Sequence, residues 1–289
     1  MKNIDPKVFD IYDDYAHNKI NRREFMDKLG VFAIGGLTVP ALLAYVLPNY
    51  DNPVIAEDDQ RIKIKMTDYD SPKGGGKIDG QLARPRGIFK KSPGVIVVHE
   101  NRGLNPYIKD VGRMLAVDGF ISLAPDALTP LGGYPGNDDE GRTLQRKRDR
   151  QEMLEDFIAA FYHLKDHPRC NGSVGVVGFC FGGWISNMMA VRVPELKAAV
   201  PFYGGQPSTD DVPNIQAPLL LHYAELDKRV NKGWAAYETA LKANNKTYTA
   251  HEYPAVKHGF HNNTTPRHNE AAATLAWKRT VNFFNEKLV

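Results

Sequence analysis

Short apolar runs alternate with longer segments of helical periodicity over most of the chain. Arg61 to Met66 alternates polar and apolar residues and pairs with Lys77 to Ala83 across Gly74-Gly75-Gly76, which predicts an antiparallel edge hairpin. The apolar run 94–99 suits a strand buried on both faces of a parallel sheet. Further strands are expected at 120–124, 173–177, 198–203, 218–223 and 247–253, and helices at 105–118, 141–167, 184–193, 231–243 and 268–287. Strands joined by helical crossovers predict a doubly wound, mostly parallel α/β sheet flanked by helices.

The first 56 residues do not follow this pattern. A helix-compatible segment, Asp5 to His17, precedes the pair Arg22-Arg23 and a glycine-interrupted apolar run from Leu29 to Leu47. This arrangement resembles a twin-arginine export signal, with a candidate cleavage site after Ala56. We therefore expect residues 1–56 to be a signal segment of a periplasmic protein that meets the membrane only during export, and residues 57–289 to be the α/β domain. The alternative is a retained arm of a cytoplasmic protein, packed on the domain or on a second copy in a homodimer.

Bulk composition narrows the class of protein. The chain has 289 residues, of which 42% are hydrophobic and 25% charged, as in an ordinary globular protein with one large domain and an appendage. The net charge is +3, and no block of five like charges occurs, so a nucleic-acid partner is not indicated. Cys170 and Cys180 lie about 30 Å apart if the chain between them is extended, too far for a disulfide.

The strongest chemical pattern is the nucleophile elbow Gly178-Phe179-Cys180-Phe181-Gly182-Gly183, with cysteine in place of serine. Such an elbow holds the nucleophile on a strained turn from strand to helix, so the residues two before and two after it must be small. A helix N-terminus also favours a thiolate. A buried structural cysteine is the alternative interpretation.

The partners that this cysteine needs follow other predicted strands. Glu100 comes after strand 94–99, Asp227 after strand 218–223 and His258 after strand 247–253. In this fold the carboxyl ends of the strands carry the functional loops, and the order nucleophile, acid, histidine is that of α/β hydrolases. His258 would take the thiol proton and Asp227 would orient its imidazole. The histidines form no firm metal-ligand motif, so we expect no metal and no cofactor.

From about residue 60 to the C-terminus the chain resembles the dienelactone hydrolase family (carboxymethylenebutenolidase-like) of the α/β hydrolase fold. The segments that carry the resemblance are Val97 to Leu104, Leu123 to Asp126, the elbow, Asp227 and Lys257 to Phe260. The resemblance implies a triad of Cys180, Asp227 and His258, with Glu100 helping to form the thiolate. It also implies an oxyanion hole made by the backbone N–H groups of Phe181 and Asn101. Without the resemblance, Glu100 would be read as a solvated carboxylate or as a partner of Arg102.

The implied reaction is hydrolysis of a small ester or lactone through a thioester. Members of the family carry a carboxylate-binding arginine four residues after the histidine, whereas this chain has Asn262 there. Arg102, Arg146 or Arg150 could replace that arginine, and Tyr134 lies in an insert that would form a pocket wall or a surface loop. The alternatives are a thioesterase or peptidase on the same fold, or a non-catalytic relative of the family.

Overall fold

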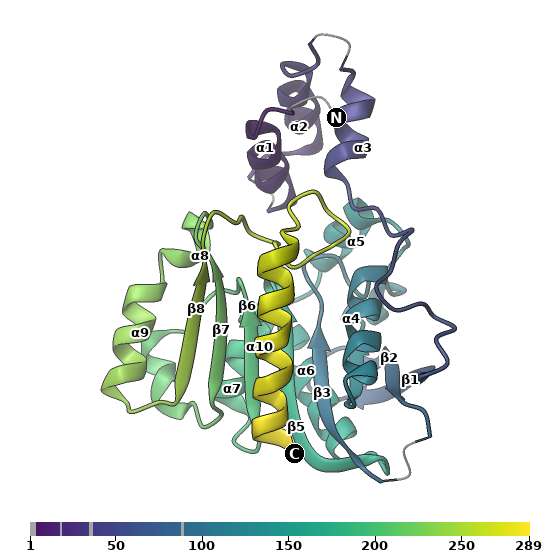
Figure 1. Ribbon diagram of the computed structural model, residues 1–289, viewed down its shortest axis with the longest axis vertical. Coiled ribbons are helices and arrows are strands. Elements are labelled where there is room, and N and C mark those ends of the chain that lie inside the picture. Colours follow the sequence, from purple (N-terminus) through teal and green to yellow (C-terminus); the bar gives the residue numbers. More distant parts are fainter. Residues whose placement is uncertain (1–3, 18, 35–36, 88–89) are drawn as a thin grey trace.

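The computed structural model describes residues 4–17, 19–34, 37–87 and 90–289. Figure 1 shows an α/β domain and, above it, a smaller bundle of three helices. The domain is built on one eight-stranded sheet of order β1-β2-β4-β3-β5-β6-β7-β8. Its strands are β1 Ile62–Ser71, β2 Gly76–Pro85, β3 Ser92–Val98, β4 Ile121–Pro125, β5 Cys170–Phe179, β6 Ala198–Phe202, β7 Leu219–Ala224 and β8 Tyr248–Tyr253.

The sheet is parallel except at one edge. The hairpin of β1 and β2 is antiparallel, and β2 also pairs antiparallel with β4, whereas β4, β3 and β5 to β8 run parallel to their neighbours. The middle strands are apolar because helices cover both faces. This arrangement confirms the predicted α/β hydrolase fold with its antiparallel hairpin.

Two apolar cores lie on opposite faces of the sheet. One packs α6 (Arg150–Lys165), α7 (Phe181–Arg192) and α9 (Trp234–Ala243), and the other packs α4 (Pro106–Val117) and α10 (Glu270–Leu288). The alternating strand residues Ile96 and Val97 belong to different cores, as expected of side chains that point to opposite faces. The carboxyl ends of the parallel strands are left uncovered by these helices.

The prediction of one long helix over 141–167 is wrong, because this segment forms two helices, α5 (Asp138–Gln145) and α6. Arg148 turns into the protein at the break, donates to the backbone oxygen of Ala127 and forms an ion pair of 2.8 Å with the fully buried Asp156. Asp149 then caps α6 by accepting from the N–H groups of Gln151 and Glu152. A continuous helix could not offer this buried pair, which helical periodicity does not reveal.

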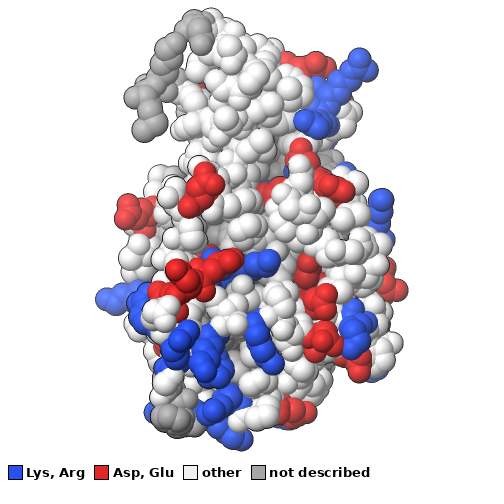
Figure 2. Space-filling view, turned by 90° about the vertical axis from the view of Figure 1, so that its right-hand side faces the viewer, with Lys and Arg blue, Asp and Glu red and all other residues white. Residues whose placement is uncertain are grey.

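The described residues between 4 and 47 form a three-helix bundle, here called the N-terminal unit, made of α1 (Lys7–Ala16), α2 (Arg22–Gly30) and α3 (Val39–Val46). It has its own apolar core, which includes Tyr12, Phe25 and Leu29. Asn21 and Glu24 form a capping box at the start of α2. The unit sits over the carboxyl ends of the parallel strands (Figure 1) and stands out as a knob above a narrower waist (Figure 2).

Residues 48–61 lead from this unit back along α4. The carboxylate of Asp110 accepts from the N–H groups of Val54 and Ile55, and Arg113 donates to the Ile55 oxygen at 2.7 Å. Tyr50 donates to Asp138 at 2.8 Å. The connection is therefore held on the domain. Among the helices that the structure describes, none is long and apolar enough to cross a membrane.

Candidate active site

Cys180 occupies a strained turn between β5 and α7, with φ 57° and ψ −110°. A side chain at Gly178 would collide with the backbone oxygen of Gly182, and one at Gly182 would collide with that of Val98. Both neighbours must therefore be glycine, which is the spacing that the sequence pattern predicts. The turn presents the partly exposed thiol at the N-terminus of α7.

His258 and Asp227 form a close pair beside this thiol. Nδ1 of His258 lies 2.5 Å from Oδ2 of Asp227, so the ring donates Nδ1–H to the carboxylate. Asp227 is held by its own position as N-cap of α8 (Lys228–Asn231), where Oδ1 accepts from the N–H of Val230 at 3.1 Å. Nε2 of His258 is buried and has no hydrogen-bond partner within the described part of the chain. It is therefore free to exchange a proton with Cys180.

A second histidine, which the sequence analysis did not select, reaches the same sulfur. Nε2 of His17, at the end of α1, lies 3.7 Å from Sγ of Cys180. The rings of His17 and His258 meet edge to face, 4.8 Å apart between centroids. The ligand atoms of His17, Cys180 and His258 all lie within 4.8 Å of one another. The sequence holds one weak signal for this residue, because His17 ends the predicted helical segment and follows Asp13 by four residues.

The charges around the sulfur favour a thiolate. Burial opposes ionisation of Cys180, but the positive charge of His258 and the hydrogen bond to His17 outweigh it, so the pKa of the thiol is held well below its ordinary value. Burial likewise opposes the charged form of His258, yet the charges of Cys180 and Asp227 raise its pKa to about 10. The two shifts together favour a thiolate on Cys180 and an imidazolium on His258, each of which stabilises the other.

Glu100 lies in the loop after β3 and is 3% exposed. Its Oε2 accepts a hydrogen bond of 3.1 Å from the side-chain amide of Asn262, which is fully buried. Burial raises the pKa of Glu100 in spite of nearby arginines, and the charge of Cys180 raises it further. The charge of Cys180 therefore acts on Glu100. Of the two alternatives considered for Glu100, a solvated carboxylate does not fit its burial, and Arg102 forms its ion pair with Asp138 instead.

Arg102 and Tyr134 both turn to Asp138 rather than to the sulfur. Arg102 forms a buried ion pair with Asp138 at 2.8 Å, and the hydroxyls of Tyr134 and Tyr50 donate to the same carboxylate. The structure therefore gathers these two predicted substrate-binding residues in a separate cluster. The third, Asn262, donates its side-chain amide to Glu100.

The other two candidate arginines differ in position. Arg146 is exposed and donates to Thr143. The guanidinium of Arg150 stacks on the ring of Trp184 in α7, with 3.4 Å to the ring centroid, and the charge of Cys180 acts on it. Of these two arginines, Arg150 is the one on which the charge of Cys180 acts.

Phe181 and Asn101 are the two residues whose backbone N–H groups are expected to form the oxyanion hole. Phe181 is the first residue of α7, and Asn101 follows Glu100 in the loop after β3. Among the hydrogen bonds of the described residues, neither N–H is donated to an acceptor. Both are therefore available to a developing negative charge, as helix N-terminal and loop N–H groups are in this fold.

The cluster of His17, Cys180 and His258 has the ligand types that a zinc ion accepts. The guanidinium of Arg229, however, lies 3.1 Å from Nε2 of His17 and 3.3 Å from Nδ1 of His258. A fixed positive charge there disfavours a second cation. The expectation that the protein needs no metal stays a prediction.

Comparison with known proteins shows the family of the chain. The model of the dienelactone hydrolase family matches residues 78–288, and a model described as YqhI-like matches residues 1–33. The hydrolase fragment YghX of Escherichia coli is 49% identical over 114 residues, which are 39% of this chain and 97% of the fragment. A candidate carboxymethylenebutenolidase of Synechocystis is 30% identical and covers 78% of this chain, with 99% of its own length matched.

Among solved structures, a candidate dienelactone hydrolase of Klebsiella pneumoniae superposes with a TM-score of 0.68 at 26% identity. The match covers 78% of this chain and 99% of that one. Family model, relatives and fold coincide over the domain that carries Cys180, Asp227 and His258. The chain belongs to the dienelactone hydrolase family and is a hydrolase that acts on ester bonds.

Proposed function

We propose that the protein hydrolyses a small ester or lactone with Cys180 as the nucleophile. The observation that carries the proposal is the strained elbow that presents Cys180 beside the buried, unpartnered Nε2 of His258. A thiolate at this place needs no further activation, since its proton already resides on an imidazole.

In the first half-reaction the Cys180 thiolate attacks the carbonyl carbon, and a C–S bond forms. The carbonyl oxygen becomes an oxyanion that the N–H groups of Phe181 and Asn101 stabilise. Collapse of this intermediate breaks the C–O bond, and the leaving alkoxide takes the proton from His258. A lactone opens in the same step, so its alcohol stays joined to the acyl group. The product is a thioester on Cys180 and a neutral His258.

In the second half-reaction His258 removes a proton from water, and the hydroxide adds to the thioester carbonyl. Collapse of that intermediate breaks the C–S bond and releases the carboxylic acid, which leaves the thiolate and imidazolium as at the start. Asp227 holds the ring in the tautomer that both steps need and stabilises its positive charge. Glu100 is a buried carboxyl of raised pKa near the sulfur, placed to help form the thiolate.

The test compares Cys180→Ala with Cys170→Ala, which removes the other cysteine, buried at the start of β5. Hydrolysis of nitrophenyl esters and simple lactones should fall by about a thousandfold or more in the first variant only. Intact mass after rapid quenching should show one acyl group on the wild type. Full activity of Cys180→Ala would refute the proposal. Turnover of acyl thioesters or peptide anilides in preference to esters would favour the alternative activities.

A further inference from the structure

We propose that His17 is a catalytic residue of this site and that the N-terminal unit is therefore part of the active site. This inference rests on the proposed cysteine mechanism and adds a second imidazole to it. When the Cys180 thiol ionises, its S–H bond breaks and the proton passes to Nε2 of His17 or of His258. The sulfur is then flanked by two rings that can each carry the proton.

The two rings are built in the same way. His258 directs Nδ1 to Asp227, and His17 directs Nδ1 to Asp13, with 2.8 Å to its backbone oxygen and 3.3 Å to its carboxylate. In each pair the aspartate side fixes the tautomer, so that Nε2 faces the sulfur. Two histidine–aspartate pairs from opposite ends of the chain thus converge on one thiol.

The groups that face His17 come from four elements. Asp13 lies on its own helix, Cys180 at the elbow, His258 in the loop after β8, and Arg229 in α8. Asp13 and the sulfur favour the charged ring, whereas burial, His258 and Arg229 oppose it. Arg229 also adds fixed positive charge beside the thiolate. His17 lowers the pKa of the Cys180 thiol through its hydrogen bond and its charge. Removal of His17 should therefore raise that pKa.

The domain is shaped to receive this unit. Asn101, next to Glu100, donates its side-chain amide to the Ala16 oxygen at 2.7 Å, directly before His17. Arg102 donates to the hydroxyl of Tyr12, and Arg267 pairs with Asp13 at 3.3 Å. Both arginines are less than 9% exposed. Undocking the unit would remove partners from these two arginines, which favours the docked state.

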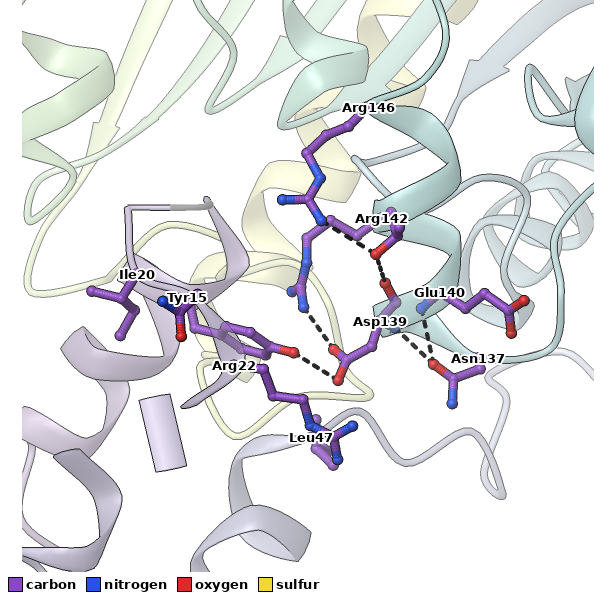
Figure 3. A pocket seen from close by; sticks show the side chains of 11 residues that line it. Tyr15, Ile20, Arg22, Leu47, Asn137, Asp139, Glu140, Arg142 and Arg146 are labelled. Carbon is purple, nitrogen blue, oxygen red and sulfur yellow. Dashed lines mark hydrogen bonds and ion pairs between the residues drawn. The ribbon is translucent and has the colours of Figure 1, made fainter. Parts of the chain in front are cut away.

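A second anchor lies between the unit and α5, where Figure 3 shows Tyr15 and Arg142 both directed at Asp139. The Tyr15 hydroxyl donates to that carboxylate at 2.8 Å, and Arg142 lies over the tyrosine ring at 4.1 Å while pairing with Asp139 at 2.7 Å. The unit is thus fixed on both sides of His17. Its position over the sulfur is part of the folded protein.

The unit also forms one wall of a cavity of about 400 Å³ beside the triad. Phe9, Asp13 and Lys19 line it from the unit, and Leu226, Arg229 and His258 line it from the domain. A cavity of this size that opens on His258 would hold a small ester or lactone. Cys180 itself does not line this cavity, so a substrate that enters it would contact both the unit and the domain on its way to the sulfur.

The experiment uses the full-length protein with His17→Gln, Asp13→Asn and, as a control in α2 of the same unit, Asp27→Asn, whose side chain is exposed. The rate of alkylation of Cys180 by iodoacetamide is followed from pH 5 to 9, with kcat on a nitrophenyl ester and the melting temperature. His17→Gln should move the alkylation profile toward higher pH by about one unit, so that the rate at pH values below the pKa of the thiol falls about tenfold, and should lower kcat by tenfold or more. Asp27→Asn should leave all three values unchanged.

The outcomes separate this inference from the proposed function. If His17→Gln melts normally and leaves the alkylation profile and kcat unchanged, His17 is not catalytic, although loss of activity in Cys180→Ala would still support the cysteine mechanism. A rise of kcat in His17→Gln would also overturn the inference, because it would make the unit an inhibitor. If His17→Gln fails to fold, Asp13→Asn must show the same acid-side loss of alkylation, and an unchanged profile there refutes the inference. Partial rescue of His17→Gly by added imidazole would support it.

Discussion

Asn262 donates its side-chain amide to the carboxylate of Glu100 at 3.1 Å, and both side chains are buried. Asn262 stands four residues after His258, where the family resemblance implies a carboxylate-binding arginine. Its side-chain amide binds Glu100 of the same chain instead. The amide is thus committed within the protein, and under the proposed function we expect substrate recognition to come from other groups, among them the N-terminal unit.

We predict that Asn262→Ala lowers kcat by about tenfold, because it removes a hydrogen bond to a buried carboxyl group, a contact worth about 1.5–3 kcal/mol. Steady-state hydrolysis of a nitrophenyl ester checks this. The matched control is Asn244→Ala, whose amide donates only to a helix carbonyl. Equal kcat in both variants would show that Glu100 does not depend on Asn262.

Asp227→Asn should keep the fold and lower kcat by about a thousandfold or more, since a neutral amide no longer fixes the tautomer of His258 or stabilises its charge. Asp210→Asn, at an exposed position in the short helix Thr209–Asn214, is the control. The two variants are compared by kcat and by circular dichroism. A loss of less than tenfold in Asp227→Asn would remove Asp227 from the triad.

The pKa shifts predict a wide pH range for the active ion pair. Because the pKa of Cys180 lies well below its ordinary value and that of His258 is raised to about 10, alkylation of Cys180 should already be fast at pH 6 and kcat should fall toward pH 10. The same shifts fix the sign for stability. The raised pKa of His258 stabilises the fold fully below its ordinary value of 6.5, and this contribution is lost as the pH rises through about 10.

A pH series of melting temperatures for the wild type and His258→Gln measures that linkage. The wild type should lose its advantage over the variant between pH 6.5 and 10. If the difference between the two melting temperatures grew with pH instead, the imidazolium would not be the stabilising form. An alkylation rate that rose only near pH 9 would mean an ordinary thiol.

Gly182→Ala should destabilise the protein by about 3 kcal/mol or more, because the added methyl group collides with the backbone oxygen of Val98, which cannot move without shifting β3. Gly30→Ala is the control, since nothing lies within 4 Å of a side chain there. Thermal unfolding followed by circular dichroism measures both. Similar melting temperatures for the two variants would show that the elbow tolerates a larger residue.

Much of the domain could be predicted from local sequence patterns. The apolar run at 94–99 and the glycines around Cys180 follow directly from burial and from close backbone contact, so the sheet and the elbow were evident. The break between α5 and α6 was not, because it depends on the buried pair of Arg148 with Asp156. Helical periodicity depends only on which residues are apolar, so it cannot predict that Arg148 is buried.

The site was predictable only where strand ends marked it. Glu100, Asp227 and His258 follow predicted strands, and parallel strands bring such loops together. His17 follows a helix in a segment that the arginine pair assigned to an export signal, and nothing local shows where a bundle of three helices docks. Its contact with Cys180 spans 163 residues along the chain. Long-range docking of this kind is invisible to periodicity and spacing.

A cleaved export signal and a retained N-terminal unit predict different masses for the active enzyme. A signal cleaved after Ala56 would leave a mature protein without His17, whereas our inference requires that active protein retain it. We predict that active protein isolated from its native cells retains the N-terminal unit and yields the peptide that contains His17. Intact mass and peptide mapping of the cytoplasmic and periplasmic fractions, each assayed for ester hydrolysis, decide the matter. Periplasmic, fully active protein that begins after Ala56 would confirm export and overturn the role of His17, because such an enzyme turns over without the second imidazole.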